Sequence, residues 1–208
     1  MKNEQLIPLS AAAGFVATAL AAETPAVSDL IAKIKSTDDA VRGPAWQAAG
    51  PAGAPAVGPL AAVMTDPNFE VARAAKRAIE KIVRYAGRPG ADKERKAVET
   101  ELIKLLKDPA ADVRRHALWM LSEIGDDQAV APMAALLTDA EAREDARCAL
   151  QRIPGGKATA ALRQAIPGAP EEFKYALADA LRARGEKVDG YPSRKLVPTR
   201  TTAVTPAP

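Results

Sequence analysis

Apolar residues in the segment 112–124 recur every three or four positions, which is the spacing of one face of an α-helix. At about 100° per residue they form a single stripe, and its members are Val113, Ala117, Met120, Leu121 and Ile124. Trp119 falls on roughly the opposite side of this helix, beside Arg115 and Ser122. The pattern therefore predicts a helix that is buried along one face and points its largest apolar side chain away from that face.

The same stripe recurs five times along the chain. The residues that align with one another follow at intervals of 30, 42, 29 and 31 positions, and they are Val41, Val71, Val113, Ala142 and Phe173. A shorter apolar helix is expected before each of them, around residues 30–35, 54–65, 93–107, 128–138 and 157–166. Such a helix pair cannot cover its own apolar face, so neighbouring pairs must stack to form one continuous core. We therefore expect an all-α fold, an α-solenoid of about five helix pairs over residues 28–185, wound as a right-handed superhelix.

The segment 108–139, DPAADVRRHALWMLSEIGDDQAVAPMAALLTD, resembles a HEAT repeat of the short, PBS-lyase-like kind. The features that carry the resemblance are an Asp in the turn of each pair, a Val-Arg pair opening the second helix and a Pro inside the first helix. In such a repeat the Asp can cap a helix and meet an Arg from a neighbouring repeat. The resemblance thus implies a structural ladder made by Asp66, Asp108, Asp139, Arg42, Arg114 and Arg143. The last repeat departs from this pattern, because Lys174 replaces the Arg and Pro167-Gly168 replaces the turn acid.

Three segments lie outside the repeats. Residues 1–21 combine a lysine near the start, an apolar stretch and a small-residue cleavage motif ending at Ala21, which predicts a signal peptide followed by a linker at 22–27. A signal peptide implies that the protein is exported to the periplasm or the cell exterior. The alternative is that this segment is an Ala-rich first helix of a cytoplasmic protein. The intact mass of the mature chain distinguishes the two. The insertion at 85–94 is either a projecting binding loop or a longer loop between two extended helices. Residues 186–208 are rich in Pro and Thr and are expected to form a disordered or extended tail.

The residue inventory argues against an enzyme. The chain has one His and one Cys, so no His/Cys metal cluster can form, and a carboxylate-only site would need acids converging from several repeats. His116 aligns with Asp145 of the next repeat, but this pair lacks a nucleophile, so we expect it to make a structural hydrogen bond. No glycine-rich phosphate loop or serine-centred elbow is present. We therefore expect no catalytic residue, metal site or cofactor, and we infer no small-molecule substrate.

Charge gives little support to a nucleic-acid partner. The formal net charge is +3 on 208 residues, and the second helix of the second repeat carries a local surplus of positive charge. Its counterparts in the next two repeats are nearly balanced, whereas a groove that follows phosphates should be basic over several repeats. The apolar stretch at the N-terminus is too short and too weakly apolar to predict a stable membrane span.

The second helices of a HEAT solenoid line its concave side, which places Trp119 in the middle of that face. Aromatic and Arg side chains together are typical of interface hot spots, and Arg115 could stack on the indole; the alternative is that Trp119 packs flat against Arg77 and Arg115 and covers no ligand. We expect a protein or peptide partner to contact Trp119, Arg115, Arg77, Lys76, Arg147 and Trp46. The protein is then a non-enzymatic interaction scaffold. The alternatives are an accessory, chaperone-like subunit of a protein-modifying enzyme similar to bilin lyases, and a solenoid that binds a polyanion.

Overall fold

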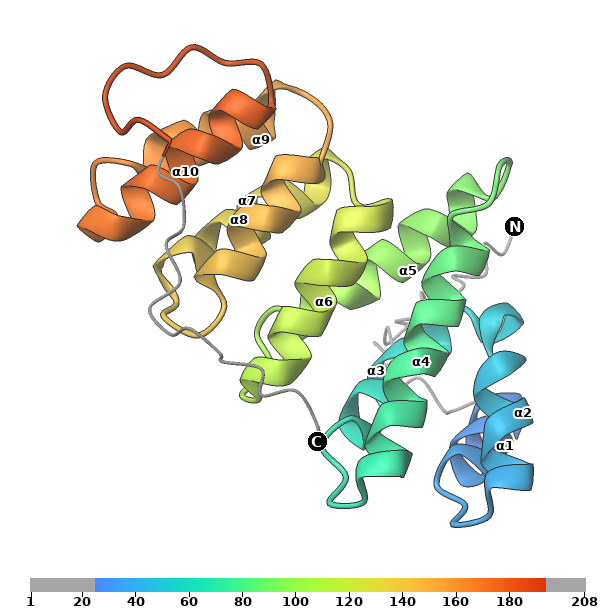
Figure 1. Ribbon diagram of the computed structural model, residues 1–208. Helices are drawn as coiled ribbons and strands as arrows, with labels where there is room; N and C mark the ends of the chain where they lie inside the picture. Colours follow the sequence, from blue (N-terminus) through green and yellow to red (C-terminus); the bar gives the residue numbers. More distant parts are fainter. Residues whose placement is uncertain (1–24, 194–208) are drawn as a thin grey trace, which may run out of the picture.

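The computed structural model describes residues 25–193, and this part of the chain forms ten α-helices and two short 3₁₀ helices without any strand (Figure 1). The α-helices are α1 (Pro25–Ile34), α2 (Asp39–Gln47), α3 (Ala54–Val63), α4 (Phe69–Ala86), α5 (Asp92–Leu105), α6 (Ala111–Ile124), α7 (Asp127–Ala135), α8 (Arg143–Arg152), α9 (Gly156–Ala165) and α10 (Glu171–Ala183). The 3₁₀ helices are η1 (Gly50–Ala52) and η2 (Leu136–Thr138). These positions confirm the all-α fold of five helix pairs.

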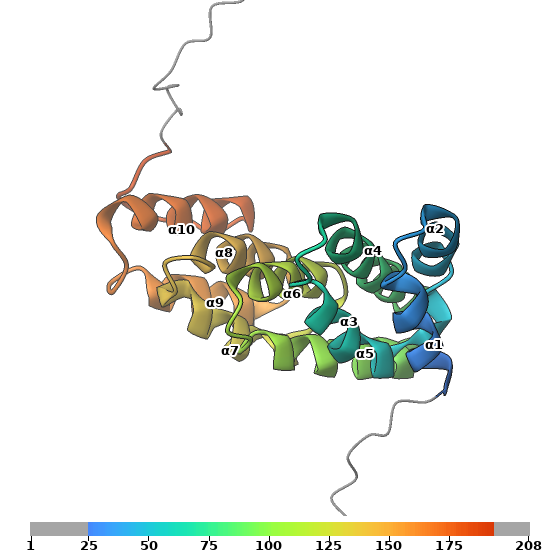
Figure 2. The ribbon, with the colours of Figure 1, turned by 90° about the horizontal axis from the view of Figure 1, so that it is seen from below.

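The pairs stack in chain order to form a solenoid. Figure 2 shows the odd-numbered helices in one row and the even-numbered helices in a second row beside it. The even-numbered row dips at α6, so this row is the hollow side of the stack. Within it, α4 and α6 contact each other less than α2 contacts α4 or α6 contacts α8. The stack is therefore most open along the boundary between α4 and α6.

The predicted apolar stripe forms the core. Val113, Ala117 and Leu121 are at most 1% exposed, and the aligned positions in the other even-numbered helices from α4 onward are equally buried. Many of these positions hold Ala, which lets neighbouring helices approach closely, because the distance between helix axes depends on the side chains at the contact. Val41 is an exception to the predicted stripe and is 41% exposed. It lies on α2, which starts the even-numbered row, so no earlier helix of that row is described that could cover it.

The turn acids stabilise their own turns, and one of them also forms a ladder contact. The expectation that they cap helices is wrong, because Asn68 caps α4 and the N-cap positions of α6 and α8 hold Ala110 and Ala142. Asp66, Asp108 and Asp139 each accept a hydrogen bond from the backbone N–H two residues further on, at 2.8 to 2.9 Å. Asp139 also pairs with Arg114 of the preceding repeat at 3.0 Å, which confirms the ladder at that position.

The predicted Asp–Arg ladder contact is wrong for the two remaining arginines, Arg42 and Arg143. Buried Arg42 donates to the carbonyl of Ser36 at 2.6 Å and pairs with Asp39, so it folds back onto its own turn instead of reaching Asp66. Arg143 has no turn acid to meet, and its guanidinium lies 5.3 Å from the centre of the Phe173 ring. The two exceptions have different causes. Arg42 is engaged by acceptors of its own turn although Asp66 is present, whereas the turn that faces Arg143, Pro167-Gly168, has no carboxylate.

Two predicted boundaries need correction. Helix α1 already begins at Pro25, and Val27 is 2% exposed, so residues 25–27 belong to the stack and not to a linker. The insertion at 85–94 is mostly helical, because α4 continues to Ala86 and α5 begins at Asp92. The two extended helices agree with the second of the two expected arrangements, but the loop between them, residues 87–91, is short and not long. The predicted signal peptide and residues 194–208 of the predicted tail lie outside the described residues.

The start of the predicted tail, residues 186–193, packs against α10. Arg182 on that helix donates to the carbonyls of Gly190 at 2.8 Å and Tyr191 at 2.7 Å. The ring of Tyr191 meets Tyr175 edge-on, with the ring centres 5.4 Å apart. The prediction of disorder is therefore wrong for this segment, because a polar, Pro-containing sequence is held here by contacts to the helix that precedes it.

The long helix α5 brings a carboxylate into the core. Glu99 is fully buried, and its Oε1 accepts a hydrogen bond from the backbone N–H of Asp126 at 2.7 Å. Arg95 on the same helix donates to the carbonyl of Ile124 at 2.8 Å. Burial raises the pKa of Glu99, and the hydrogen bond from Asp126 partly opposes this shift. These contacts join α5 to the junction between α6 and α7.

Candidate functional site

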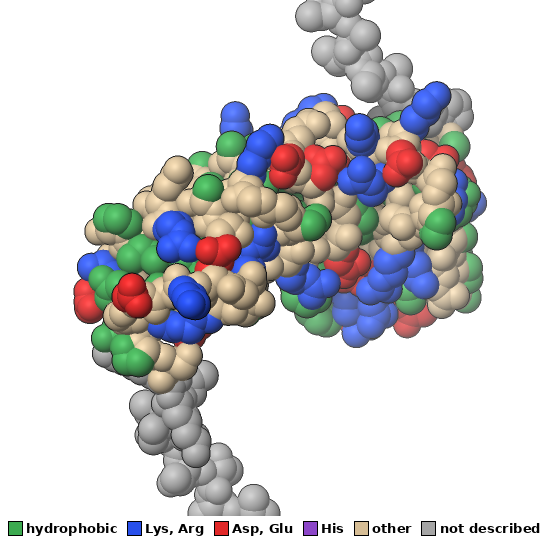
Figure 3. All heavy atoms as spheres, turned by 90° about the horizontal axis from the view of Figure 1, so that it is seen from above, with side chains coloured by type: hydrophobic (Ala, Val, Ile, Leu, Met, Phe, Trp, Pro, Cys, Tyr) green, Lys and Arg blue, Asp and Glu red, His purple; other side chains and the backbone are tan. Residues whose placement is uncertain are grey.

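The side chains predicted to contact a partner all lie on even-numbered helices, which line the hollow side of the stack. They are Trp46 on α2, Lys76 and Arg77 on α4, Arg115 and Trp119 on α6, and Arg147 on α8. The tertiary structure divides this set between two grooves and the surface of α8. Figure 3 shows the molecule from above, with one edge of its outline indented between the two halves of the stack.

The larger groove has a volume of about 670 Å³ and lies between α4 and α6. We call it the concave groove, and its lining residues are Met64, Phe69, Ala72, Arg73, Lys76, Glu80, Asp112, Arg115, His116, Trp119 and Asp145. Three of the predicted residues, Lys76, Arg115 and Trp119, are brought together here. The groove coincides with the boundary at which α4 and α6 pack least closely, so the spacing of the repeats creates it.

Two exposed aromatic side chains belong to the concave groove. Phe69, the first residue of α4, is 70% exposed, and Trp119 is 52% exposed. Large apolar side chains left in water on both sides of a groove are typical of a binding surface. The sequence analysis missed Phe69. It lies on the side of α4 opposite Val71 and its apolar stripe, the same signal that drew attention to Trp119.

The charges in the groove are partly neutralised. Arg115 reaches across to α8, where its Nε donates to Oδ2 of Asp145 at 2.8 Å. Arg73 pairs with Glu70 on its own helix. Lys76 has no ion-pair partner within the part of the chain that the structure describes. The groove thus combines two aromatic rings with one cation that is available to a ligand.

Trp119 is not stacked as the sequence suggested. Its ring is approached by Arg152 from the last turn of α8, with the guanidinium carbon 5.7 Å from the ring centre. The expected stacking of Arg115 is wrong because Asp145 engages that guanidinium. The alternative, packing against Arg77 as well as Arg115, is also wrong, since Arg77 lies over Trp46 at 5.0 Å. Much of the indole therefore remains open to solvent.

Trp46 and Arg77 line a separate, smaller groove of about 220 Å³ between α2 and α4. Lys81 also lies over the Trp46 ring, 5.8 Å from its centre, so two cations of α4 lie against this half-buried indole. Arg147 lines neither groove. Its side chain donates to Glu144 and Gln151, both at 3.0 Å, along the surface of α8.

His116 lies at the base of the concave groove and is 5% exposed. Burial lowers its pKa to about 4; the positive charge of Lys76 adds to this effect and a hydrogen bond with the Lys76 backbone opposes it. Its Nε2 atom has no hydrogen-bond partner in the described structure. The expected hydrogen bond with Asp145 is wrong, because that carboxylate is bound to Arg115. The imidazole is therefore neutral at physiological pH.

The repeats match a known family over most of the stack. The model for HEAT repeats matches residues 59–152 and, in a second overlapping match, residues 99–182. The chain belongs to the HEAT-repeat family. The matched region of this HEAT-repeat protein runs from α3 to α10 and includes the whole concave groove. No curated protein sequence matches the chain.

Solved structures similar to this HEAT-repeat protein include designed repeat proteins. One is a designed armadillo repeat protein in complex with peptide (KR)4, which is 23% identical, with a TM-score of 0.45 over 76% of this chain and 81% of that chain. Another is described as computationally designed armadillo repeat proteins for modular peptide recognition, with 24% identity and a TM-score of 0.44 over 76% of this chain and 82% of that chain.

Residues 25–193 offer neither a cluster of metal ligands nor a helix suited to the bilayer. In this part of the HEAT-repeat protein, no three His, Cys, Asp or Glu side chains are grouped so that they could hold a metal ion. Between residues 25 and 193, none of the helices has the length and apolar character that crossing a membrane requires.

Proposed function

We propose that this HEAT-repeat protein is a non-enzymatic scaffold that binds a segment of another protein in its concave groove. The repeat solenoid supplies a rigid row of helices, and the opening between α4 and α6 supplies a groove wide enough for side chains of a partner. An apolar side chain of the partner would insert between Phe69 and Trp119, while Lys76 and Arg115 offer polar contacts at its edge.

The observation that carries the proposal is the exposure of Phe69 and Trp119 on facing helices around one groove. Burying two such rings against a partner removes a large apolar area from water, and interface energy is concentrated in a few aromatic and Arg side chains of this kind. The imidazole of His116 supports a binding role over proton transfer, because it is buried and its pKa lies far below neutrality.

A random peptide library displayed on phage and selected against the full chain tests the proposal. We expect enriched peptides with an apolar anchor residue, and we expect Trp119→Ala to weaken their binding at least about tenfold, since the variant removes a central anchor. Phe69→Ala should weaken the same peptides. Affinity is measured by fluorescence polarisation with the labelled peptide.

Tyr85→Ala is the matched control. Tyr85 is 41% exposed on α4, like Trp119 an exposed ring on an even-numbered helix, but it lies outside the concave groove. Its replacement should leave peptide affinity unchanged. Peptides that bind Trp119→Ala and Phe69→Ala as tightly as the unaltered protein, or the absence of any enriched peptide, would contradict the proposal.

A further inference from the structure

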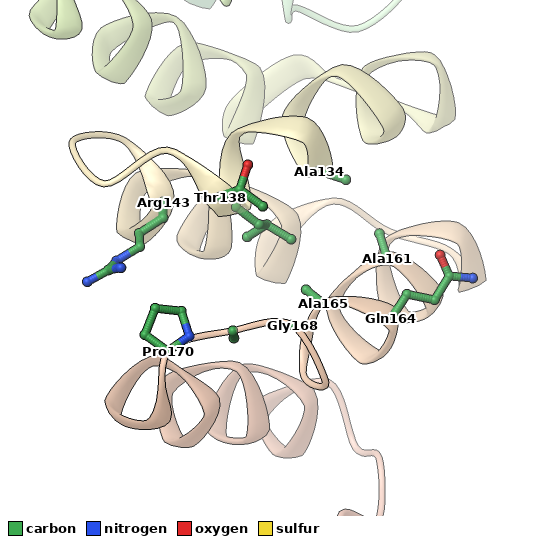
Figure 4. Close-up of a pocket in the computed structure, with 10 residues that line it drawn as sticks. Ala134, Thr138, Arg143, Ala161, Gln164, Ala165, Gly168 and Pro170 are labelled. Carbon is green, nitrogen blue, oxygen red and sulfur yellow. The ribbon is translucent and has the colours of Figure 1, made fainter.

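A third cavity, separate from the two grooves, lies where the last two helix pairs meet. It has a volume of about 510 Å³ and is bounded by α7, the η2 turn, α9 and the turn that leads to α10. It shares no lining residue with the concave groove. Figure 4 shows Arg143 and Pro170 at one end of this cavity and Ala161 and Gln164 at the other.

Arg143 occupies the place of the ladder arginine in its repeat. In the preceding repeat the equivalent residue is Arg114, which pairs with Asp139 at 3.0 Å and Glu141 at 3.3 Å in the next turn along the chain. For Arg143 the corresponding turn contains Pro167-Gly168, which has no carboxylate. The cavity is lined by Gly168 and by Arg143, so it opens where the missing acid would stand.

The guanidinium of Arg143 is held in position but not neutralised. It lies over the buried ring of Phe173, 5.3 Å from the ring centre. Among residues 25–193 no carboxylate lies within ion-pair distance of it; Glu171, at the start of α10, is paired with Lys174 at 3.0 Å. A fixed arginine without a counter-charge favours an anion, and its planar fork matches a carboxylate.

The rest of the cavity is mainly apolar. Ala134, Leu137, Ala161 and Ala165 provide its walls, and Gln164 provides a polar group at the end opposite Arg143. A volume of about 510 Å³ is within the range of small-molecule sites. Figure 4 shows the Arg143 side chain extending away from these walls, so that its guanidinium lies at the outer end of the cavity. The arrangement suits a short molecule whose charged end stays at the mouth of the cavity.

We infer that this cavity binds a small carboxylic acid in its ionised form, with the carboxylate on Arg143 and the apolar body between α7 and α9. The carboxylate of the bound ligand takes the place of the turn acid that Pro167-Gly168 lacks. This site is independent of the concave groove and of the peptide that we propose for it.

Titration of the ¹⁵N-labelled protein with hexanoate tests the inference. We expect saturable shifts of the Ala165 and Gly168 amide signals, with a Kd on the order of 1 mM for a ligand of this size. Hexan-1-ol and hexylammonium, which have the same apolar body without the negative charge, should bind at least about tenfold more weakly. Arg143→Gln should weaken hexanoate by a similar factor.

Gly168→Asp provides a second variant that does not depend on removing Arg143. A Cβ atom at Gly168 would meet nothing within 4 Å, so the side chain can be added without a clash. The new carboxylate should pair with Arg143 as Asp139 pairs with Arg114, and it should abolish hexanoate binding. Gly168→Asn has the same shape without the charge and should retain binding.

Three results would overturn the inference: no saturable shift with hexanoate, equal binding of hexan-1-ol and hexanoate, or unchanged hexanoate binding by both Arg143→Gln and Gly168→Asp. Circular dichroism of each variant confirms that it is folded. The outcome is separate from the peptide experiment, because Trp119→Ala should bind hexanoate normally.

Discussion

The imidazole of His116 connects the candidate site to stability. It lies between α4 and α6 at the base of the concave groove, and burial together with the charge of Lys76 disfavours its protonated form. In the unfolded chain the same group has an ordinary pKa near 6.5. Since its pKa in the folded protein is lowered to about 4, the unfolded state binds a proton first as the pH falls.

We therefore expect a stability contribution that is fully present above about pH 6.5 and is lost as the pH falls towards 4. A shift of this size corresponds to about 3 kcal/mol for a buried group. Urea unfolding of the protein and of His116→Asn at pH 7.5 and pH 4.5 measures this contribution. Asn is neutral at both values, so the unaltered protein should lose more stability than the variant.

The difference between the two proteins is the informative quantity, because carboxylates also titrate in this range. Hydrogen bonds to backbone N–H groups lower the pKa values of Asp126 and Asp139, so their contributions also decline in acid, in both proteins alike. An equal loss of stability in the protein and in His116→Asn would contradict the assignment to His116.

At the scale of single elements, the carbonyl groups at the C-terminal end of α8 are bound by one side chain, that of Arg184 at the end of α10. The last carbonyls of a helix have no partner within the helix. Here Arg184 donates to the carbonyls of Leu150, Ile153 and Gly155, at 3.1, 2.6 and 2.6 Å, and its Nε donates to Thr159 at 2.9 Å. A single guanidinium thus joins the last two repeats at three consecutive elements, α8, α9 and α10.

We expect Arg184→Ala to lower the free energy of unfolding by about 2 to 4 kcal/mol, because several buried carbonyls lose a charged donor at once. Chemical denaturation followed by circular dichroism measures the loss. Arg163→Ala is the control: Arg163 forms an exposed ion pair with Glu186 at 2.6 Å, and such pairs contribute little. Similar losses of unfolding free energy in Arg184→Ala and Arg163→Ala would show that the contacts of Arg184 with the carbonyl groups do not stabilise the C-terminal end of the stack.

At the scale of the whole molecule, the fold is a row of units that contact their neighbours. The even-numbered row is weakest between α4 and α6, and there the two halves are joined mainly through α5, which packs on both α3 and α6. In such a stack, stability is approximately the sum of repeat and nearest-neighbour terms. A substitution that destabilises one repeat should therefore destabilise that repeat and its neighbours, and leave distant repeats unchanged.

Hydrogen exchange of Arg184→Ala tests this locality. We expect faster amide exchange in α8, α9 and α10, and unchanged exchange in α1 to α4, because α5, α6 and α7 lie between the two groups of helices along the stack. Mass spectrometry of peptic fragments resolves the two regions. Uniformly faster exchange along the chain would show instead that the stack opens as one cooperative unit.

The spacing of apolar residues alone determined the type and order of the elements, the buried face of the even-numbered helices from α4 onward and the outward direction of Trp119. These features are local, because a period of 3.6 residues sets the direction of every side chain within one helix. The end of α6 is local in the same sense, because a Cβ at its C-cap residue Gly125 would lie 2.6 Å from the carbonyl oxygen of Leu121.

Only the tertiary structure decided which side chains meet. It brought Phe69 into the same groove as Trp119, and it placed Arg152 instead of Arg115 over the indole. It also placed Arg143 beside a cavity at the position where the other repeats have a turn acid. These contacts join different repeats, so they depend on how far apart neighbouring helices pack. The distance between neighbouring helices results from the fit of many core side chains and from the lengths of α4 and α5. The apolar period within one helix carries no information about either.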